Sequence, residues 1–114
     1  MIVLIKIDKY RKDVSISQGD TLTLCVYQDS ISLNTNDTVI FTISTDIHTT
    51  EYIIRKNCII IDEFNIVVNA TKEEMSVLEE DKTYYYDFVL LRNGTRYTLN
   101  FPYKFYVIGR VNNE

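Results

Sequence analysis

The chain carries few residues whose types and spacing could support chemistry. His48 is the only histidine, and the two cysteines are Cys25 and Cys58. A catalytic thiol needs a neighbouring base and is often activated at a helix N-terminus, whereas both cysteines fall in or beside predicted strands. His48 is instead predicted to be a surface turn residue. Because a nucleophile elbow and a glycine-rich phosphate loop are also missing, the sequence predicts no catalytic residues, no cofactor and no enzymatic activity.

Two acidic clusters are the remaining candidates for chemistry, because carboxylates are the ligands that Ca²⁺ prefers. They are Asp62-Glu63 and Glu79-Glu80-Asp81. A calcium loop supplies several oxygens at a set spacing around a sharp glycine turn, and neither cluster has that pattern. Both are therefore predicted to be solvated turn residues, and no metal site is expected.

The overall charge narrows the classes of partner. The 114 residues carry a net charge of −4. Nucleic acids and anionic membrane surfaces both attract clustered basic residues, so neither is expected as a partner. The apolar run at residues 1–5 ends at Lys6 and is too short for a signal peptide. Synthesis in a cytoplasm is therefore expected, where the two cysteines would remain free thiols.

Tyrosine is the unusual residue of this chain, with nine copies and no tryptophan. It suits interfaces because it combines apolar area with a hydrogen-bonding tip. Side chains alternate along a strand, and this parity predicts Tyr84, Tyr86 and Tyr97 in the core. The tyrosines predicted to face outward form the candidate interaction face: Tyr85, Tyr106 and Tyr27.

A β-hairpin is predicted from Tyr84 to Val107. Its turn is Asn93-Gly94, the strongest short-range hairpin signal, because both central residues of a type I′ turn need positive φ. Pro102 is predicted to mark a bulge or an edge position in the second arm. One hairpin cannot bury so many aromatic side chains alone, so a second sheet must pack against it.

The rest of the chain supplies that second layer as short strands separated by polar turns, a spacing typical of an all-β, antiparallel β-sandwich. A short helix before the hairpin is predicted over 72–79, since Thr71 and Glu74 have the spacing of a capping box. The 114 residues are read as one domain, with an N-terminal strand and charged connection over 1–13 and a polar tail over 109–114. The other strands are predicted at 14–17, 21–27, 38–44, 51–56, 59–61 and 65–69.

Two of these strands contain continuous apolar triplets, Ile59-Ile60-Ile61 and Ile66-Val67-Val68. Such a run is typical of a strand covered on both faces, or of a strand with a binding partner on one face. Periodicity leaves both interpretations open.

Four motifs occur in order along the chain: Ser17-Gln18-Gly19-Asp20-Thr21-Leu22, Asp37-Thr38-Val39-Ile40-Phe41-Thr42-Ile43, Asn69-Ala70-Thr71-Lys72-Glu73-Glu74-Met75 and Tyr84-Tyr85-Tyr86-Asp87-Phe88. A further stretch, from Leu78 to Tyr84, resembles the tyrosine corner of immunoglobulin-like and fibronectin III sandwiches. The four motifs, in this order and spacing over residues 17–108, resemble those of small β-sandwich modules in bacteriophage and prophage tails and baseplates.

This resemblance implies an immunoglobulin-like sandwich that is a non-catalytic structural part of a virion tail, assembled in the cytoplasm of a bacterial host. The partners it implies are other tail or virion proteins, with homo-oligomerisation into a ring or trimer as a further expectation. The alternative is a carbohydrate-binding or host-adhesion module, in which exposed tyrosines stack on sugar rings. Three coplanar exposed tyrosines would favour that alternative.

Overall fold

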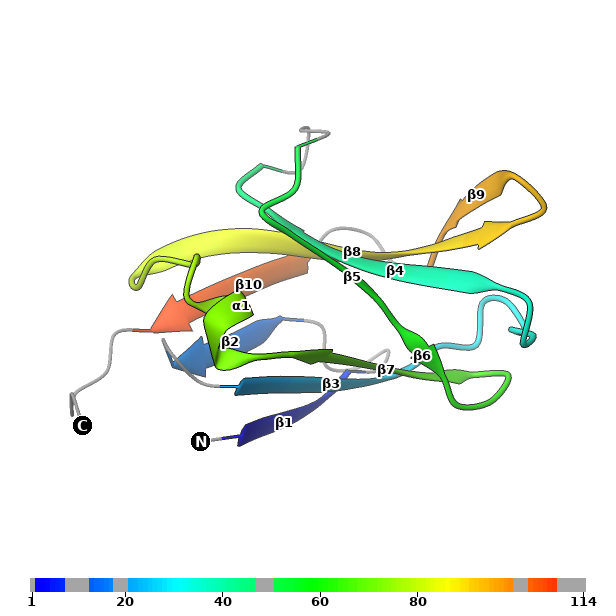
Figure 1. Cartoon of the computed structure of the whole chain (residues 1–114), viewed down its shortest axis with the longest axis horizontal. Coiled ribbons are helices and arrows are strands. Elements are labelled where there is room, and N and C mark those ends of the chain that lie inside the picture. The colour runs from blue at the N-terminus through cyan, green and yellow to red at the C-terminus, as the bar shows by residue number, and fades with distance from the viewer. Residues whose placement is uncertain (1, 8–12, 18–20, 47–50, 100–102, 109–114) are drawn as a thin grey trace.

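The computed structural model describes residues 2–7, 13–17, 21–46, 51–99 and 103–108, and it forms two facing β-sheets with one short helix at an end (Figure 1). The predictions for His48 and Pro102 lie outside the described residues. The elements are β1 Ile2–Ile7, β2 Val14–Ser17, β3 Thr21–Tyr27, β4 Thr38–Ser44, β5 Ile54–Asn57, β6 Ile59–Ile60, β7 Asn65–Ala70, α1 Lys72–Met75, β8 Lys82–Arg92, β9 Thr95–Thr98 and β10 Tyr103–Ile108.

One sheet, here called sheet A, has the strand order β1-β3-β7-β6, and sheet B has the order β2-β10-β8-β4-β5 with β9 also paired to β8. Most neighbours are antiparallel, but β1 pairs with β3 and β2 pairs with β10 in parallel. The chain therefore folds as an immunoglobulin-like all-β sandwich, as expected, and its two N-terminal strands join one sheet each in the parallel sense.

The core lies between the sheets, and in β3 it follows the alternation of the strand, whereas residues 39–43 of β4 are all buried. In β3, Leu22 and Leu24 are buried while Tyr27 is exposed. Aromatic rings from β4 and β8 meet at the centre, where the centroids of Phe41 and Phe88 are 5.1 Å apart. The largest fully buried side chains are Tyr84, Tyr86, Phe41, Phe88, Phe105, Leu22, Leu24, Ile43, Ile66, Leu78, Leu90 and Val14.

The hairpin turn forms as predicted, because Asn93 and Gly94 both have positive φ, at 51° and 78°. The second arm is not one continuous strand, however. Leu99 donates its N–H to the Phe88 carbonyl, whereas Tyr103 pairs with Tyr86. The register of the second arm against β8 therefore shifts by two residues between β9 and β10.

The helix is shorter than predicted. Thr71 and Glu74 form the expected capping box, but the regular helix ends at Met75 rather than at residue 79. Met75 and Leu78 are both buried and close one end of the sandwich. The four-residue α1 is far too short to cross a membrane, and no other helix occurs among the described residues.

The approach to β8 has the hydrogen bond of a tyrosine corner. The Tyr84 hydroxyl, on a side chain only 2% exposed, accepts the backbone N–H of Glu79 at 2.8 Å. Asp81 takes a positive φ of 58° in the intervening turn, and its N–H donates to the Val107 carbonyl. These bonds connect the end of the helix region to both strands of the terminal hairpin.

Candidate interaction surface

The three tyrosines of the predicted interaction face lie on two different sheets. Tyr85 and Tyr106 are half-buried on the outer face of sheet B, in the neighbouring strands β8 and β10. Tyr27 ends β3 in sheet A and is 45% exposed. The structure therefore brings Tyr85 and Tyr106 together and places Tyr27 apart from them, so the three do not form one coplanar platform.

Tyr97 was predicted in the core and is instead 40% exposed. It keeps the predicted parity, because it pairs with the fully buried Leu90. Its strand, β9, pairs with β8 alone among the described residues. A side chain on such an edge strand has a neighbour on one flank only, which explains the exposure.

Three exposed apolar side chains of the described residues, Tyr27, Ile59 and Ile61, lie on the outer face of sheet A. Together with their neighbours they are here called the sheet A patch. The patch has two rows of side chains that run across the strands. In the first row, Ile59 pairs with Val67, which pairs with Cys25. In the second row, Ile61 and Tyr27 lie on either side of Asn65. Ile59 and Ile61 are 56% and 59% exposed. The patch comprises Tyr27, Ile59, Ile61, the half-buried Val67 and Cys25, and Phe64, whose ring centroid is 6.3 Å from that of Tyr27.

Polar contacts mark the ends of the sheet A patch. On one side the Thr23 hydroxyl donates to the Asn69 side chain at 2.8 Å. On the other, Asp62 accepts the backbone N–H groups of Phe64 and Asn65, both at 2.9 Å. The bond from Phe64 holds the pKa of the Asp62 carboxyl below its usual value. With the exposed Glu63 beside it, this end of the patch carries negative charge.

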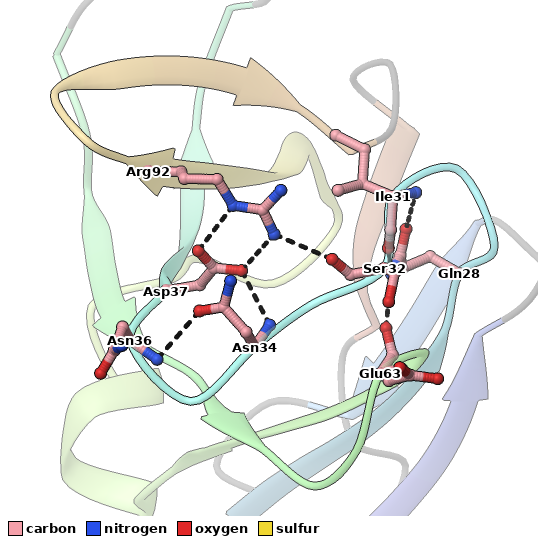
Figure 2. Close-up of polar contacts among 8 residues, drawn as sticks. All are labelled: Gln28, Ile31, Ser32, Asn34, Asn36, Asp37, Glu63 and Arg92. Atoms are coloured by element: carbon pink, nitrogen blue, oxygen red, sulfur yellow. Dashed lines mark hydrogen bonds and ion pairs between the residues drawn. The ribbon is translucent and has the colours of Figure 1, made fainter.

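A buried side chain attaches the strand end at Tyr27 to that turn. Gln28 accepts the Ile31 N–H at 3.2 Å, and its amide donates to the Ile31 carbonyl at 2.7 Å and to the Glu63 carbonyl at 3.5 Å (Figure 2). The Gln28 backbone N–H also donates to the Phe64 carbonyl. These bonds fix the end of β3 at Tyr27 against the turn that contains Asp62 and Glu63, so this end of the patch is preorganised.

An ion pair attaches the loop between β3 and β4, which begins at Gln28, to Arg92 at the end of β8. Arg92 donates from Nε and Nη2 to the Asp37 carboxylate at 2.8 and 2.5 Å, and from Nη2 to the Ser32 carbonyl at 2.8 Å (Figure 2). The Asp37 side chain is only 2% exposed, and it also accepts the Asn34 N–H. The Arg92 guanidinium is the main cause that lowers the pKa of Asp37.

Chemistry beyond binding finds little support among the described residues. No group of three or more histidine, cysteine, aspartate or glutamate side chains there could hold a metal ion. Both cysteines are free, and burial raises the pKa of the Cys58 thiol to about 12. A thiol with so high a pKa is a poor nucleophile near neutral pH.

The sequence contained a signal for the sheet A patch in its apolar triplets, but periodicity could not say which faces were covered. In the structure Ile60 packs against the core, while Ile59 and Ile61 point outward and stay exposed. The described part of the chain therefore leaves one face of this triplet open. Of the two interpretations, a strand covered on both faces or a strand with a binding partner on one face, this geometry favours the second.

No family model matches the chain, and no curated protein matches it by sequence. Among solved structures, the chain is similar to the N-terminal domain of ORF48 of phage TP901-1, with a TM-score of 0.50 and 10% sequence identity, over 96% of this chain and 98% of that one. A solution structure of amebosin is similar with a TM-score of 0.36 and 12% identity, over 90% of this chain and 96% of that one. At such low identity the first comparison shows the fold: this chain shares it with a domain of a phage protein.

Proposed function

We propose that this chain is a non-catalytic structural module of a phage or prophage tail, of the kind found in baseplates, and that it works by docking on a neighbouring virion protein. The observation that carries the proposal is the sheet A patch, where Tyr27, Ile59 and Ile61 are each 45% exposed or more. Contiguous apolar side chains on a folded surface commonly mark protein interfaces. The fold shared with a phage protein domain supports placing that interface in a virion.

The chemistry of the sheet A patch describes the partner. Its exposed side chains are mainly apolar, with the rings of Tyr27 and Phe64 at the acidic end, and apolar and aromatic residues are typical of interface centres. Its edge carries Asp62 and Glu63 without a basic side chain in contact with them in the described hydrogen bonds and ion pairs. We therefore expect an apolar partner surface with lysine or arginine at its rim, because complementary charge speeds association and selects among partners.

A matched pair of substitutions tests this function. Ile59 and Val77 are equally exposed, at 56% and 55%, but Val77 lies outside the sheet A patch, just after α1. The chain would be co-expressed with each tail protein encoded beside its gene, and complexes would be measured by light scattering after size exclusion. Ile59→Asp is expected to abolish a complex that the wild-type chain and Val77→Asp both form.

Two results would count against the proposal. One is the absence of a complex with any neighbouring tail protein. The other is an equal loss of binding in the two variants, which would indicate a general effect of the added charge rather than docking through the sheet A patch.

A further inference from the structure

Among the described residues, no strand pairs with the outer edge of β9 in the β8–β9 hairpin. Figure 1 shows β9 at one end of the molecule, away from the paired strands β2 and β10. Strand β2 covers the outer edge of β10 from Phe105 to Ile108, whereas β9 pairs with β8 alone among the described residues. All four residues of β9 are exposed. An edge of this kind can accept another strand through its backbone.

The phase of the hydrogen bonds in the hairpin identifies the backbone groups at the open edge. Leu99 donates its N–H to Phe88, so that N–H points toward β8. Bonding residues alternate along an antiparallel strand, and therefore Thr95 and Tyr97 also direct their backbone groups to β8. The N–H and carbonyl groups of Arg96 and Thr98 point away from β8, toward the open edge.

We infer that this edge pairs with the β9 strand of a second copy of the chain, antiparallel about a two-fold axis at Tyr97. In that register Arg96 of each copy hydrogen-bonds Thr98 of the other, so both outward pairs are satisfied. A register centred on Arg96 would instead place two guanidinium groups directly opposite, which is unfavourable. The charge pattern therefore disfavours Arg96 as the centre, and a centre at Tyr97 pairs both outward residues within β9, which ends at Thr98.

The chosen register also improves the environment of an exposed ring. Tyr97 would face its own copy as a non-hydrogen-bonded pair, in which the two Cα atoms are about 4.5 Å apart. The side chain is 40% exposed in the single chain, and aromatic pairs across strands are favourable. Two-fold pairing is the commonest symmetry of oligomers and requires one surface that complements itself. Because only four residues pair, the dimer is expected to depend on protein concentration.

Cysteine crosslinking tests the register directly, in a Cys25→Ser background that removes the half-buried patch thiol. Tyr97→Cys places two thiols opposite each other within disulfide reach, which needs Cα atoms closer than about 7 Å. Thr95→Cys is the control on the same strand, since residues two positions from the axis lie about 13 Å from their copies. Mild oxidation is expected to convert Tyr97→Cys to covalent dimer and to leave Thr95→Cys monomeric. Equal crosslinking of both, or of neither, would overturn the register.

Amide exchange tests the pairing in the wild-type chain, without a variant that could misfold. Raising the protein concentration should slow exchange at Arg96 and Thr98 by more than about tenfold, while Tyr97, already bonded to β8, is protected throughout. Arg96→Pro should remove the dimer and Arg96→Lys should keep it, because only proline lacks the N–H. Unprotected Arg96 and Thr98 amides at every concentration would overturn the proposal, as would protection that appears only when a different protein is added.

This edge and the sheet A patch lie on different sheets, so the two proposals can fail separately. Ile59→Asp should leave the β9 dimer unchanged, and Arg96→Pro should leave docking on a tail protein unchanged. Loss of the dimer in Ile59→Asp would refute the assignment of the dimer to β9, and loss of docking in Arg96→Pro would refute the assignment of docking to the sheet A patch alone.

Discussion

The hydrogen bond from Glu79 to the Tyr84 hydroxyl gives the sharpest stability prediction. Tyr84→Phe removes one oxygen and leaves the ring, so no cavity forms. The side chain is 2% exposed, and the Glu79 N–H loses an acceptor that lies 2.8 Å away. Leaving one partner of a buried bond unsatisfied costs about 1–3 kcal/mol. Because the Glu79 side chain is exposed, water reaches this turn in part, and we expect a cost of about 1–2 kcal/mol.

The expected change is large enough to measure. The entropy of unfolding is about 2.1 cal/mol/K per residue, so for 114 residues each kcal/mol lowers the melting temperature by about 4 °C. Thermal and urea unfolding followed by circular dichroism should therefore show a fall of about 4–8 °C in the Tyr84→Phe variant. The dependence on urea concentration should not change, since the surface exposed on unfolding is the same.

Tyr27→Phe is the matched control. It deletes the same oxygen from a side chain that is 45% exposed, and surface substitutions of this kind usually change stability by less than about 0.5 kcal/mol. If Tyr84→Phe melted within about 2 °C of the wild type, water would be replacing the hydroxyl. The corner bond would then not hold the turn between the helix and β8.

Three further outcomes follow from other contacts. The pKa of Asp37 in the folded chain lies below its usual 3.8. The ionised carboxylate therefore stabilises the fold fully well above pH 3.8, and this contribution is lost as the pH falls through 3.8 toward the folded-state pKa. Urea midpoints between about pH 6 and pH 3 should therefore fall more steeply for the wild type than for Asp37→Asn, and parallel curves would contradict this. Gly94→Ala should destabilise by about 1 kcal/mol through its φ of +78° alone, since an added Cβ would contact no atom within 4 Å; an unchanged melting temperature would refute that reasoning. In a Cys25→Ser background, Cys58, whose pKa burial raises to about 12, should react with iodoacetamide only on unfolding, and rapid labelling of the native chain would show otherwise.

Local rules in the sequence determined much of this structure. The strands Thr21–Tyr27 and Thr38–Ser44 have the predicted bounds. Tyr84 and Tyr86 are buried as their parity predicts, because alternation along a strand depends only on neighbouring residues. The Asn93-Gly94 turn formed for a similar reason, since both residues tolerate positive φ. The two-sheet architecture followed from the number of short strands and the aromatic area that they had to bury.

Which side chains remain exposed depends on how the strands assemble. Ile59 is apolar and Tyr97 has the parity of a core residue, yet each is exposed, because each lies on a strand at the end of its sheet or on a face that no other described element covers. The pairing of Asp37 with Arg92 joins residues 55 positions apart, a distance over which local periodicity carries no information. Local sequence therefore predicts most of the strands, whereas the sheet edges and outer faces, where the proposed contacts lie, depend on the order in which the strands assemble.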